Sequence, residues 1–335
     1  MKNASKPYKA VGLLSGGLDS TIATKLLLDQ GIEVHAMNIS MPWGCGRPSR
    51  VIALAAQFGI PFKSFPLGDD YLPVLTKPKY GFGSAHNPCV DCHIYMVRKA
   101  AAYMKEIGAS FVFTGEVLGQ RPMSQRRECL GWVEHDAGIP GQLLRPMSAK
   151  LLPPTIAEQE GIVDREKLLD ISGRSRKRQF ALAKELGLGG YSSPGGGCLL
   201  TEKLFGERLE DVLKRGCDNI AATAVLGLGR YFRIDDTAFV ILGRDNAENE
   251  KLVRYAVPGD VILRPTVFPG PAALLRGGTI DEARLAFVAG LSQFHSKSRD
   301  KAPQPLQCWH AQEPDKVSQV TAAVLTQADV DKLQL

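Results

Sequence analysis

Short apolar runs alternate with helix-forming segments along the first third of this 335-residue chain, which limits the folds that it can adopt. The predicted strands are residues 9–15, 32–40, 61–67 and 109–115. The predicted helices, which place apolar residues at helical spacing, are residues 19–31, 49–59 and 94–108. Strands that alternate with helices predict a doubly wound α/β fold with a parallel sheet, whose ligands bind at the carboxyl ends of the strands. Residues 115–150 are expected to be rich in loops, and residues 153–188 to be helical.

The pattern changes after residue 217, where short strands predominate. The predicted strands are residues 230–234, 238–243, 260–265, 271–277 and 317–326. One predicted helix, residues 247–256, lies among them, and the polar stretch 295–307 is expected to be an exposed loop. An amphipathic helix at 202–216 is expected to close the first domain. We therefore predict an α/β domain at residues 1–217 and a smaller α+β domain at residues 218–335.

The composition favours a globular chain and leaves the class of partner open. Hydrophobic residues make up 44% of the sequence, but no apolar run approaches a membrane span. The N-terminus lacks the apolar core of a secretory signal, so we expect a soluble, cytoplasmic protein with no membrane partner. A net charge of +6 and a pI near 8.9 suit a nucleic-acid partner and many ordinary enzymes alike. The seven cysteines are expected to be thiols, metal ligands or catalysts, with Cys45 an ordinary loop thiol.

The sequence LLSGGLDST at residues 13–21 joins the first predicted strand to the first predicted helix. Gly16 and Gly17 allow a tight turn and a close approach of the backbone to a ligand. The N–H groups and the positive end of the following helix would then face a phosphate. The hydroxyl groups that can add to these donors are those of Ser15, Ser20 and Thr21. The G-K-[ST] ending of a Walker A loop is absent, and Asp19 suits a magnesium-bound pyrophosphate. The alternative to a phosphate-binding loop is a plain helix N-cap after a flexible turn.

SGGLDS at residues 15–20 resembles the PP-loop motif of the N-type ATP pyrophosphatases. These enzymes adenylate a carbonyl oxygen, release pyrophosphate and let a nucleophile displace AMP. The resemblance implies an adenine nucleotide alpha-hydrolase-like fold with ATP and Mg²⁺ as cofactors. It also implies that residues 15–21 hold the pyrophosphate end of ATP, that Asp19 binds magnesium, and that Met37 lies near the adenine.

Three further stretches resemble enzymes that thiolate tRNA. TGEVLGQRPMSQ at residues 114–125 is similar to a segment of tRNA 4-thiouridine synthases, and LLRPM at 143–147 is similar to the short strand that follows it there. HNPCVDCH at 86–93 resembles a segment of tRNA 2-thiouridylases, with Cys92 at the catalytic position and Cys198 at that of their second catalytic cysteine. In these families a uridine carbonyl oxygen is adenylated and replaced by sulfur. The residues expected to line the nucleotide or uridine pocket are Gly115, Glu116, Gln120 and Gln125.

The cysteines leave two routes for the sulfur open, with sulfide or a persulfide carrier as donor. In one route, a persulfide on one cysteine is resolved by a second cysteine as a disulfide forms. In the other, Cys89, Cys92 and Cys198 hold a [4Fe-4S] cluster with one open iron, since a C-x-x-C pair plus a distant cysteine is a three-ligand pattern. These cysteines also resemble the ligands of iron–sulfur-dependent tRNA thiolases, and the presence of Cys89 favours the cluster.

Two other interpretations of these cysteines rank lower. A structural Zn²⁺ site would need a fourth ligand, for which His86 or His93 could serve. The glycine-rich turn 192–197 before Cys198 suits the close approach of a cofactor and argues against zinc. An inert buried thiol at Cys198 beside a chance C-x-x-C is the remaining alternative.

Basic clusters and the smaller domain point to RNA. GRSRKRQ at residues 173–179 carries four cations. Two explanations fit this cluster about equally well: contact with phosphate, or a solvated helix face. The second cluster comprises Arg121, Arg126 and Arg127. It belongs to the loop that contains the stretch 114–125, which resembles tRNA 4-thiouridine synthases, so contact with RNA or ATP is favoured there. Residues 239–278 resemble the RNA-binding domain of the NFACT proteins, which implies that the smaller domain binds tRNA.

Two other functions remain open beside an ATP-dependent tRNA thiouridine synthase, which the sequence favours. Another PP-loop enzyme, such as a 7-cyano-7-deazaguanine synthase, has a similar SGGLDS, but that family needs a cysteine cluster near its C-terminus, and the sequence has none there. A non-catalytic RNA-binding adaptor with a vestigial nucleotide fold is the second. The intact glycine-rich loop and the three placed cysteines argue against it.

Overall fold

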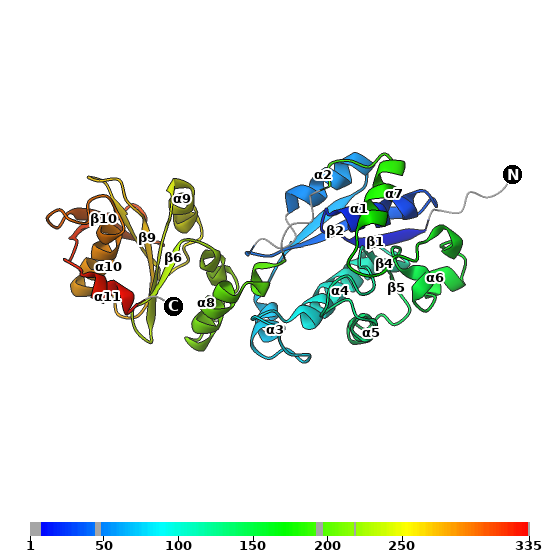
Figure 1. The fold of residues 1–335 in the computed structure, drawn as a ribbon, viewed down its shortest axis with the longest axis horizontal. Coiled ribbons are helices and arrows are strands. Elements are labelled where there is room, and N and C mark those ends of the chain that lie inside the picture. The colour runs from blue at the N-terminus through cyan, green and yellow to red at the C-terminus, as the bar shows by residue number, and fades with distance from the viewer. Residues whose placement is uncertain (1–7, 44–47, 192–196, 218, 334–335) are drawn as a thin grey trace. The chain divides into compact units, whose positions relative to one another are not determined.

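A computed structural model describes residues 8–43, 48–191, 197–217 and 219–333 (Figure 1). The chain divides into two compact units, residues 1–198 and 199–335, and each is described by itself. Cys45 and most of the glycine-rich turn before Cys198 lie outside the described residues. Within the described ranges, no helix is long and apolar enough to cross a membrane.

The first unit is a parallel sheet between two layers of helices, which confirms the predicted α/β fold. Its strands are β1 (Lys9–Leu13), β2 (Glu33–Ser40), β3 (Phe62–Pro66), β4 (Phe111–Thr114) and β5 (Leu143–Leu144). Its helices are α1 (Leu18–Leu28), α2 (Pro48–Phe58), α3 (Leu72–Thr76), α4 (Cys89–Glu106), α5 (Arg127–Asp136), α6 (Ile156–Gln159) and α7 (Lys177–Glu185). Figure 1 shows α1, α2 and α7 over one face of the sheet and α4 and α5 over the other.

The strand order β3-β2-β1-β4-β5 places a switch point at the centre of the sheet. β1 pairs in parallel with β2, ending at Leu13↔Met37, and with β4, ending at Leu13↔Thr114. The connections after β1 and after β4 therefore leave the sheet side by side in opposite directions. A crevice that suits a ligand forms at such a point, outside the carboxyl ends of the strands.

Burial explains why these apolar runs form the central strands. Ala10, Ala36 and Phe113 are fully buried, and α1 packs Ile22 and Leu27 against them in one core. Each large apolar side chain that is fully buried contributes about 1.5–3 kcal/mol relative to exposure. The central strands are thus fixed firmly enough to hold the loops at their carboxyl ends in place.

Two helices of the first unit differ from the sequence prediction. α4 begins at Cys89 rather than at residue 94, so the C-x-x-C pair belongs to its first turn. α5 occupies a stretch that we expected to be rich in loops, because Gly131 and several charged residues weaken its helical signal. Its buried residues Cys129, Leu130 and Val133 hold it against the rest of the unit.

The second unit is an α+β structure with a six-stranded sheet, as predicted for the smaller domain. Its strands are β6 (Arg230–Arg233), β7 (Ala238–Leu242), β8 (Val261–Pro265), β9 (Ala273–Gly277), β10 (Pro305–His310) and β11 (Ser318–Thr321). Its helices are α8 (Lys203–Lys214), α9 (Asn246–Arg254), α10 (Glu282–Phe294) and α11 (Gln327–Asp331). The strands pair antiparallel in the order β11-β10-β8-β9-β7-β6.

Three elements of the second unit, α10, α11 and β10, were missed from the sequence. α10 is the longest of them, and its residues 288–293 are all buried, so it lacks the polar face that marks an amphipathic helix. Gly290 allows this close packing, because a Cβ there would lie 2.6 Å from the carbonyl oxygen of Ala323. β10 begins at Pro305, inside the stretch 295–307 that was expected to be a loop.

Helix α8, which we expected to close the first domain, clusters with the second unit. Arg208 donates to the carbonyl oxygens of Leu226 and Leu228 at 2.9 and 3.0 Å. The buried carboxylate of Asp211 accepts from Tyr231 Oη of β6 at 2.5 Å and from Arg215 Nε at 2.9 Å. These contacts place the division of the chain before α8, at residues 198 and 199, rather than after residue 217.

Candidate active site

The loops after β1 and β4 meet at the switch point with their backbones in contact. Gly16 has φ +67°, and a Cβ there would lie 2.6 Å from Cβ of Arg50. A Cβ on Gly115, directly after β4, would lie 2.6 Å from the backbone nitrogen of Ser20. Both positions therefore require glycine, the first for its backbone conformation and the second for the close approach of the two loops.

The start of α1 presents donors that suit an anion. Its N-cap residue is Gly17, which has no side chain to accept from the first N–H groups. These groups have no intrahelical acceptor, and this end of a helix carries a positive partial charge. Ser20 Oγ and Thr21 Oγ1 donate to the carbonyl oxygen of Gly17 at 2.9 and 3.0 Å, so they hold the turn. Of the three predicted hydroxyl-bearing residues, only Ser15 is exposed.

Asp19 is held by a chain of two glutamines. Its Oδ2 accepts from Gln120 Nε2 at 2.8 Å, and Gln120 Oε1 accepts from Gln179 Nε2 at 3.2 Å. Gln179, in the first turn of α7, is fully buried and was not predicted as a site residue. Asp19 Oδ1 is buried and has no hydrogen-bond partner among the described residues. An unpartnered carboxylate oxygen beside a glycine turn that suits an anion fits a magnesium ligand.

Two more buried acceptors near this edge lack partners within the described part of the chain. Asn38 lies at the end of β2 and donates its Nδ2 to the carbonyl oxygen of Leu14 at 3.2 Å, but its Oδ1 is unpartnered. Gln125 Oε1 is also unpartnered, and its backbone oxygen accepts from Gly119 N at 2.7 Å to close the loop after β4. The side chain of Met37 is fully buried next to Asn38. Unpartnered buried acceptors of this kind suit a polar ligand.

The cysteine-bearing start of α4 is tied to the loop after β4. Cys89 and Cys92 stand three residues apart on one face of the helix. Asn87 Nδ2 donates to Cys89 Sγ at 3.3 Å and lies 3.6 Å from Met123 Sδ of that loop. The structure therefore brings the C-x-x-C pair to the same edge of the sheet as the glycine turn before α1.

Glu116 makes a second connection between the loop after β4 and helix α4. His93 Nδ1 lies 2.8 Å from Glu116 Oε1, while Arg145 Nε donates to Glu116 Oε2 at 3.0 Å. Glu116 and Arg145 are 6% and 4% exposed. Burial raises the pKa of Glu116, but the charge of Arg145 and the hydrogen bond from His93 outweigh burial and lower it to about 2. Both carboxylate oxygens are thus engaged within the protein.

The third predicted sulfur residue, Cys198, is the last residue of the first unit and is partly exposed. Among the residues that the structure describes, no three histidine, cysteine, aspartate or glutamate side chains are arranged to hold a metal ion. Cys89, Cys92 and Cys198 therefore do not form a ligand set in this structure. The histidines considered for zinc have other partners, since His93 contacts Glu116 and His86 Nε2 lies 2.8 Å from the carbonyl oxygen of Leu75.

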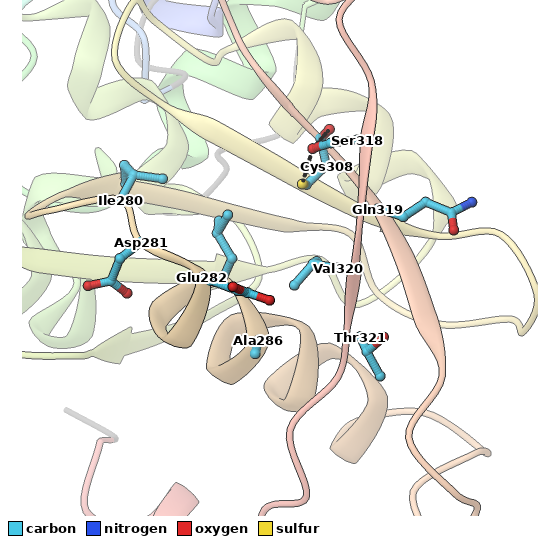
Figure 2. Close-up of a pocket in the computed structure, with 10 residues that line it drawn as sticks. Ile280, Asp281, Glu282, Ala286, Cys308, Ser318, Gln319, Val320 and Thr321 are labelled. Carbon is cyan, nitrogen blue, oxygen red and sulfur yellow. Dashed lines mark hydrogen bonds between the residues drawn. The ribbon is translucent and has the colours of Figure 1, made fainter.

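A separate cavity of about 360 Å³ lies in the second unit, between the start of α10 and strands β10 and β11 (Figure 2). Asp281 and Glu282 give it a negatively charged side, and Cys308 Sγ lies 3.0 Å from Ser318 Oγ within it. A negative rim repels phosphate. We therefore give this cavity no part in the binding of nucleotide or nucleic acid.

The open parallel sheet, the glycine turn and the acidic helix start at its switch point define a PP-loop domain, a class that binds ATP. Residues 6–147 match the family model described as thiamine biosynthesis protein (ThiI). Residues 229–332 match the model of the NFACT protein RNA binding domain. The chain therefore joins a ThiI-like PP-loop domain to an NFACT-type RNA-binding domain.

Individual relatives match part of this chain. A probable tRNA sulfurtransferase of Thermococcus kodakarensis is 27% identical over 173 residues, which are 49% of this chain and 40% of the relative. The tRNA-specific 2-thiouridylase MnmA of Dehalococcoides mccartyi is 31% identical over 117 residues, 30% of this chain and 32% of the relative. The chain thus spans less than half the length of these curated relatives. A solved 4-thiouridine synthetase–RNA complex with bound ATP superposes with a TM-score of 0.35 and 22% identity over 54% of this chain and 51% of that one.

Proposed function

We propose that this protein is an ATP-dependent tRNA thiouridine synthase. The observation that carries the proposal is the meeting of three features at one switch point: the start of α1, the loop after β4 and the cysteine-bearing start of α4. The names of the relatives, a probable tRNA sulfurtransferase and a 2-thiouridylase, support this chemistry. The NFACT-type domain supports RNA as the substrate.

The first half-reaction uses the start of α1. The unblocked N–H groups after Gly17 bind the pyrophosphate end of ATP, and Asp19 holds the magnesium ion, which neutralises phosphate charge when bound. Gln120 and Gln179 keep the Asp19 carboxylate in place. A uridine carbonyl oxygen attacks the α-phosphorus, the bond to the β-phosphate oxygen breaks, and pyrophosphate leaves with the electron pair. The uridine now carries AMP as a leaving group.

The second half-reaction replaces that AMP by sulfur. In the disulfide route, the terminal sulfur of a persulfide on Cys198 attacks the adenylated carbon, and the C–O bond breaks as AMP leaves. The thiolate of Cys92 then attacks Cys198 Sγ, which forms a disulfide and releases thiouridine, and an external dithiol reduces the disulfide. In the route that the sequence favours, Cys89, Cys92 and Cys198 would hold an iron–sulfur cluster and free sulfide would be the donor, which requires these cysteines to come closer together than in the described structure.

The activity is tested with the full chain, tRNA, ATP, Mg²⁺ and either sulfide or a persulfide donor. We expect thiouridine and AMP in equal amounts by nucleoside and nucleotide analysis. Asp19→Asn should abolish both products, and Cys198→Ala should abolish thiouridine, whereas Cys217→Ala, a thiol of the second unit, should retain both. AMP release without thiouridine on any tRNA would indicate another PP-loop enzyme, and no AMP release would indicate an RNA-binding adaptor.

The sulfur route is tested by iron and labile-sulfide analysis of protein purified without oxygen. About four irons per chain, lost in Cys89→Ala, would establish the cluster. Iron-free protein with full thiolation activity would establish the disulfide route through Cys92 and Cys198. The two outcomes exclude each other, because the same thiols serve both routes.

A further inference from the structure

Two basic segments that lie far apart in the sequence are neighbours in the first unit. Gly173 N donates to the carbonyl oxygen of Leu118 at 2.7 Å, and Leu118 pairs with Ser172 in a parallel β-bridge. Gln179 donates to Gln120 at 3.2 Å a few residues further along each segment. The loop after β4 and the segment that leads into α7 therefore run side by side next to Asp19.

This arrangement gathers basic side chains into one surface beside the nucleotide site, which we call the cationic surface. Its members are Arg121, Arg174, Arg176 and Lys177. Arg121, Arg174 and Lys177 are exposed and Arg176 is partly exposed, and none of them has an acidic partner within 4.0 Å among the described residues. The stretches 117–127 and 171–180, which contain them, include no aspartate or glutamate. Solvated helix faces usually interleave both signs of charge.

Local stability does not explain the cationic surface. α7 begins at Lys177, so Arg174 and the N-cap residue Arg176 precede the helix and do not belong to a solvated helix face. The first turn of α7 has no acidic residue. Cations at the positive end of a helix are unfavourable by a few tenths of a kcal/mol each. An anion bound at this surface would therefore relieve this crowding of like charge.

We propose that the cationic surface binds the phosphodiester backbone of RNA next to the PP-loop, so that the catalytic domain itself grips the substrate. The proposal rests on the proposed function and deepens it. RNA phosphates are favoured over ATP because α1 already offers a site for the pyrophosphate, and because the cations come from two segments that border this site. Contacts with the backbone position an RNA without reading its sequence.

The test compares two double variants of the full chain. Arg174→Ala/Lys177→Ala removes part of the cationic surface. Lys105→Ala/Lys184→Ala is the matched control, because both lysines are exposed and have no acidic partner within 4.0 Å in the described structure. Lys105 lies near the opposite edge of the sheet, where Ser110 N donates to the carbonyl oxygen of Lys9 at 2.8 Å. Thermal melts confirm that each variant folds.

tRNA binding is measured against KCl concentration, and ATP binding is measured separately. We expect Arg174→Ala/Lys177→Ala to lower the slope of log Kd against log salt by about 1.4–1.8, since each of the two lost phosphate contacts contributes about 0.7–0.9. ATP affinity and the control variant should be unchanged. An unchanged salt slope would overturn the proposal, and weaker ATP binding with an unchanged slope would assign the surface to the triphosphate instead. RNA binding needs no turnover, so this test is independent of whether the chain thiolates tRNA.

Discussion

Glu116 offers the sharpest test of how the site is built. Replacing it by glutamine keeps the shape of the side chain but removes the charge that Arg145 and His93 share. The pKa of Glu116 is lowered from 4.5 to about 2 in the folded protein, despite burial, chiefly by the charge of Arg145. At about 1.4 kcal/mol per pKa unit, this difference corresponds to about 3 kcal/mol of folding stability at neutral pH.

The pH dependence follows from the direction of this shift. Above pH 4.5 the carboxylate is ionised in both folded and unfolded chains, so the contribution is complete. As the pH falls from 4.5 towards 2, the unfolded chain binds a proton that the folded chain does not, and the contribution is lost. The difference in unfolding free energy between the wild type and Glu116→Gln should therefore fall from about 3 kcal/mol at pH 7 to about half of that at pH 3.

The assay is urea unfolding followed by tryptophan fluorescence. A Trp309→Phe background leaves Trp43 and Trp132 as the tryptophans, and both belong to the first unit. Glu106→Gln is the control, because Glu106 and its partner Lys63 are exposed and such pairs contribute less than about 1 kcal/mol. A cost for Glu116→Gln that matches the control, or that is the same at pH 7 and pH 3, would refute the reasoning.

Three further variants test other parts of the structure. Gly115→Ala forces a Cβ against the backbone of α1, so ATP binding measured by calorimetry should weaken at least about tenfold; Gly131→Ala, with open space around it, should bind as before, and equal affinities would contradict the close approach. Gln179→Leu removes the donor to Gln120, which in turn holds Asp19. The variant should raise several-fold the Mg²⁺ concentration that half-saturates AMP release, and an unchanged Mg²⁺ requirement would show that Gln179 does not position Asp19. Asp211→Asn should lower the unfolding free energy of the second unit by about 3 kcal/mol in urea titrations, whereas the exposed Glu210→Gln should cost less than about 1 kcal/mol, and a similar cost for both would show that α8 is not anchored through this carboxylate.

The sequence predicts those parts of the fold whose signal is local. The strands β1 to β4 are apolar runs bounded by turns. The turn formed by the glycines of SGGLDST can be predicted from their neighbours in the chain alone. Helix α10 escapes prediction because it is buried on nearly every side, and the boundary before α8 escapes because Asp211 bonds to a strand that comes later in the chain. Both depend on packing that no single segment encodes.

In the candidate site, too, some features follow from local sequence and others depend on tertiary contacts. The placement of Asp19 and of the C-x-x-C pair at one edge follows from the order of strands and helices. The roles of Glu116 and Gln179 do not follow, because their partners lie in other elements. The only local signal for Gln179 was its position directly after a run of cations, which suggested a helix surface rather than a fully buried amide.

The carboxylate of Glu116 has a consequence for how the cysteines meet a substrate. One of its oxygens is bound to Arg145, deep in the frame of the first unit, and the other is bound to the residue that follows Cys92. The start of α4 is consequently preorganised before any RNA arrives. In the proposed reaction, ordering it requires no binding energy from the substrate, so the affinity for RNA contributes instead to bringing one uridine to the thiols.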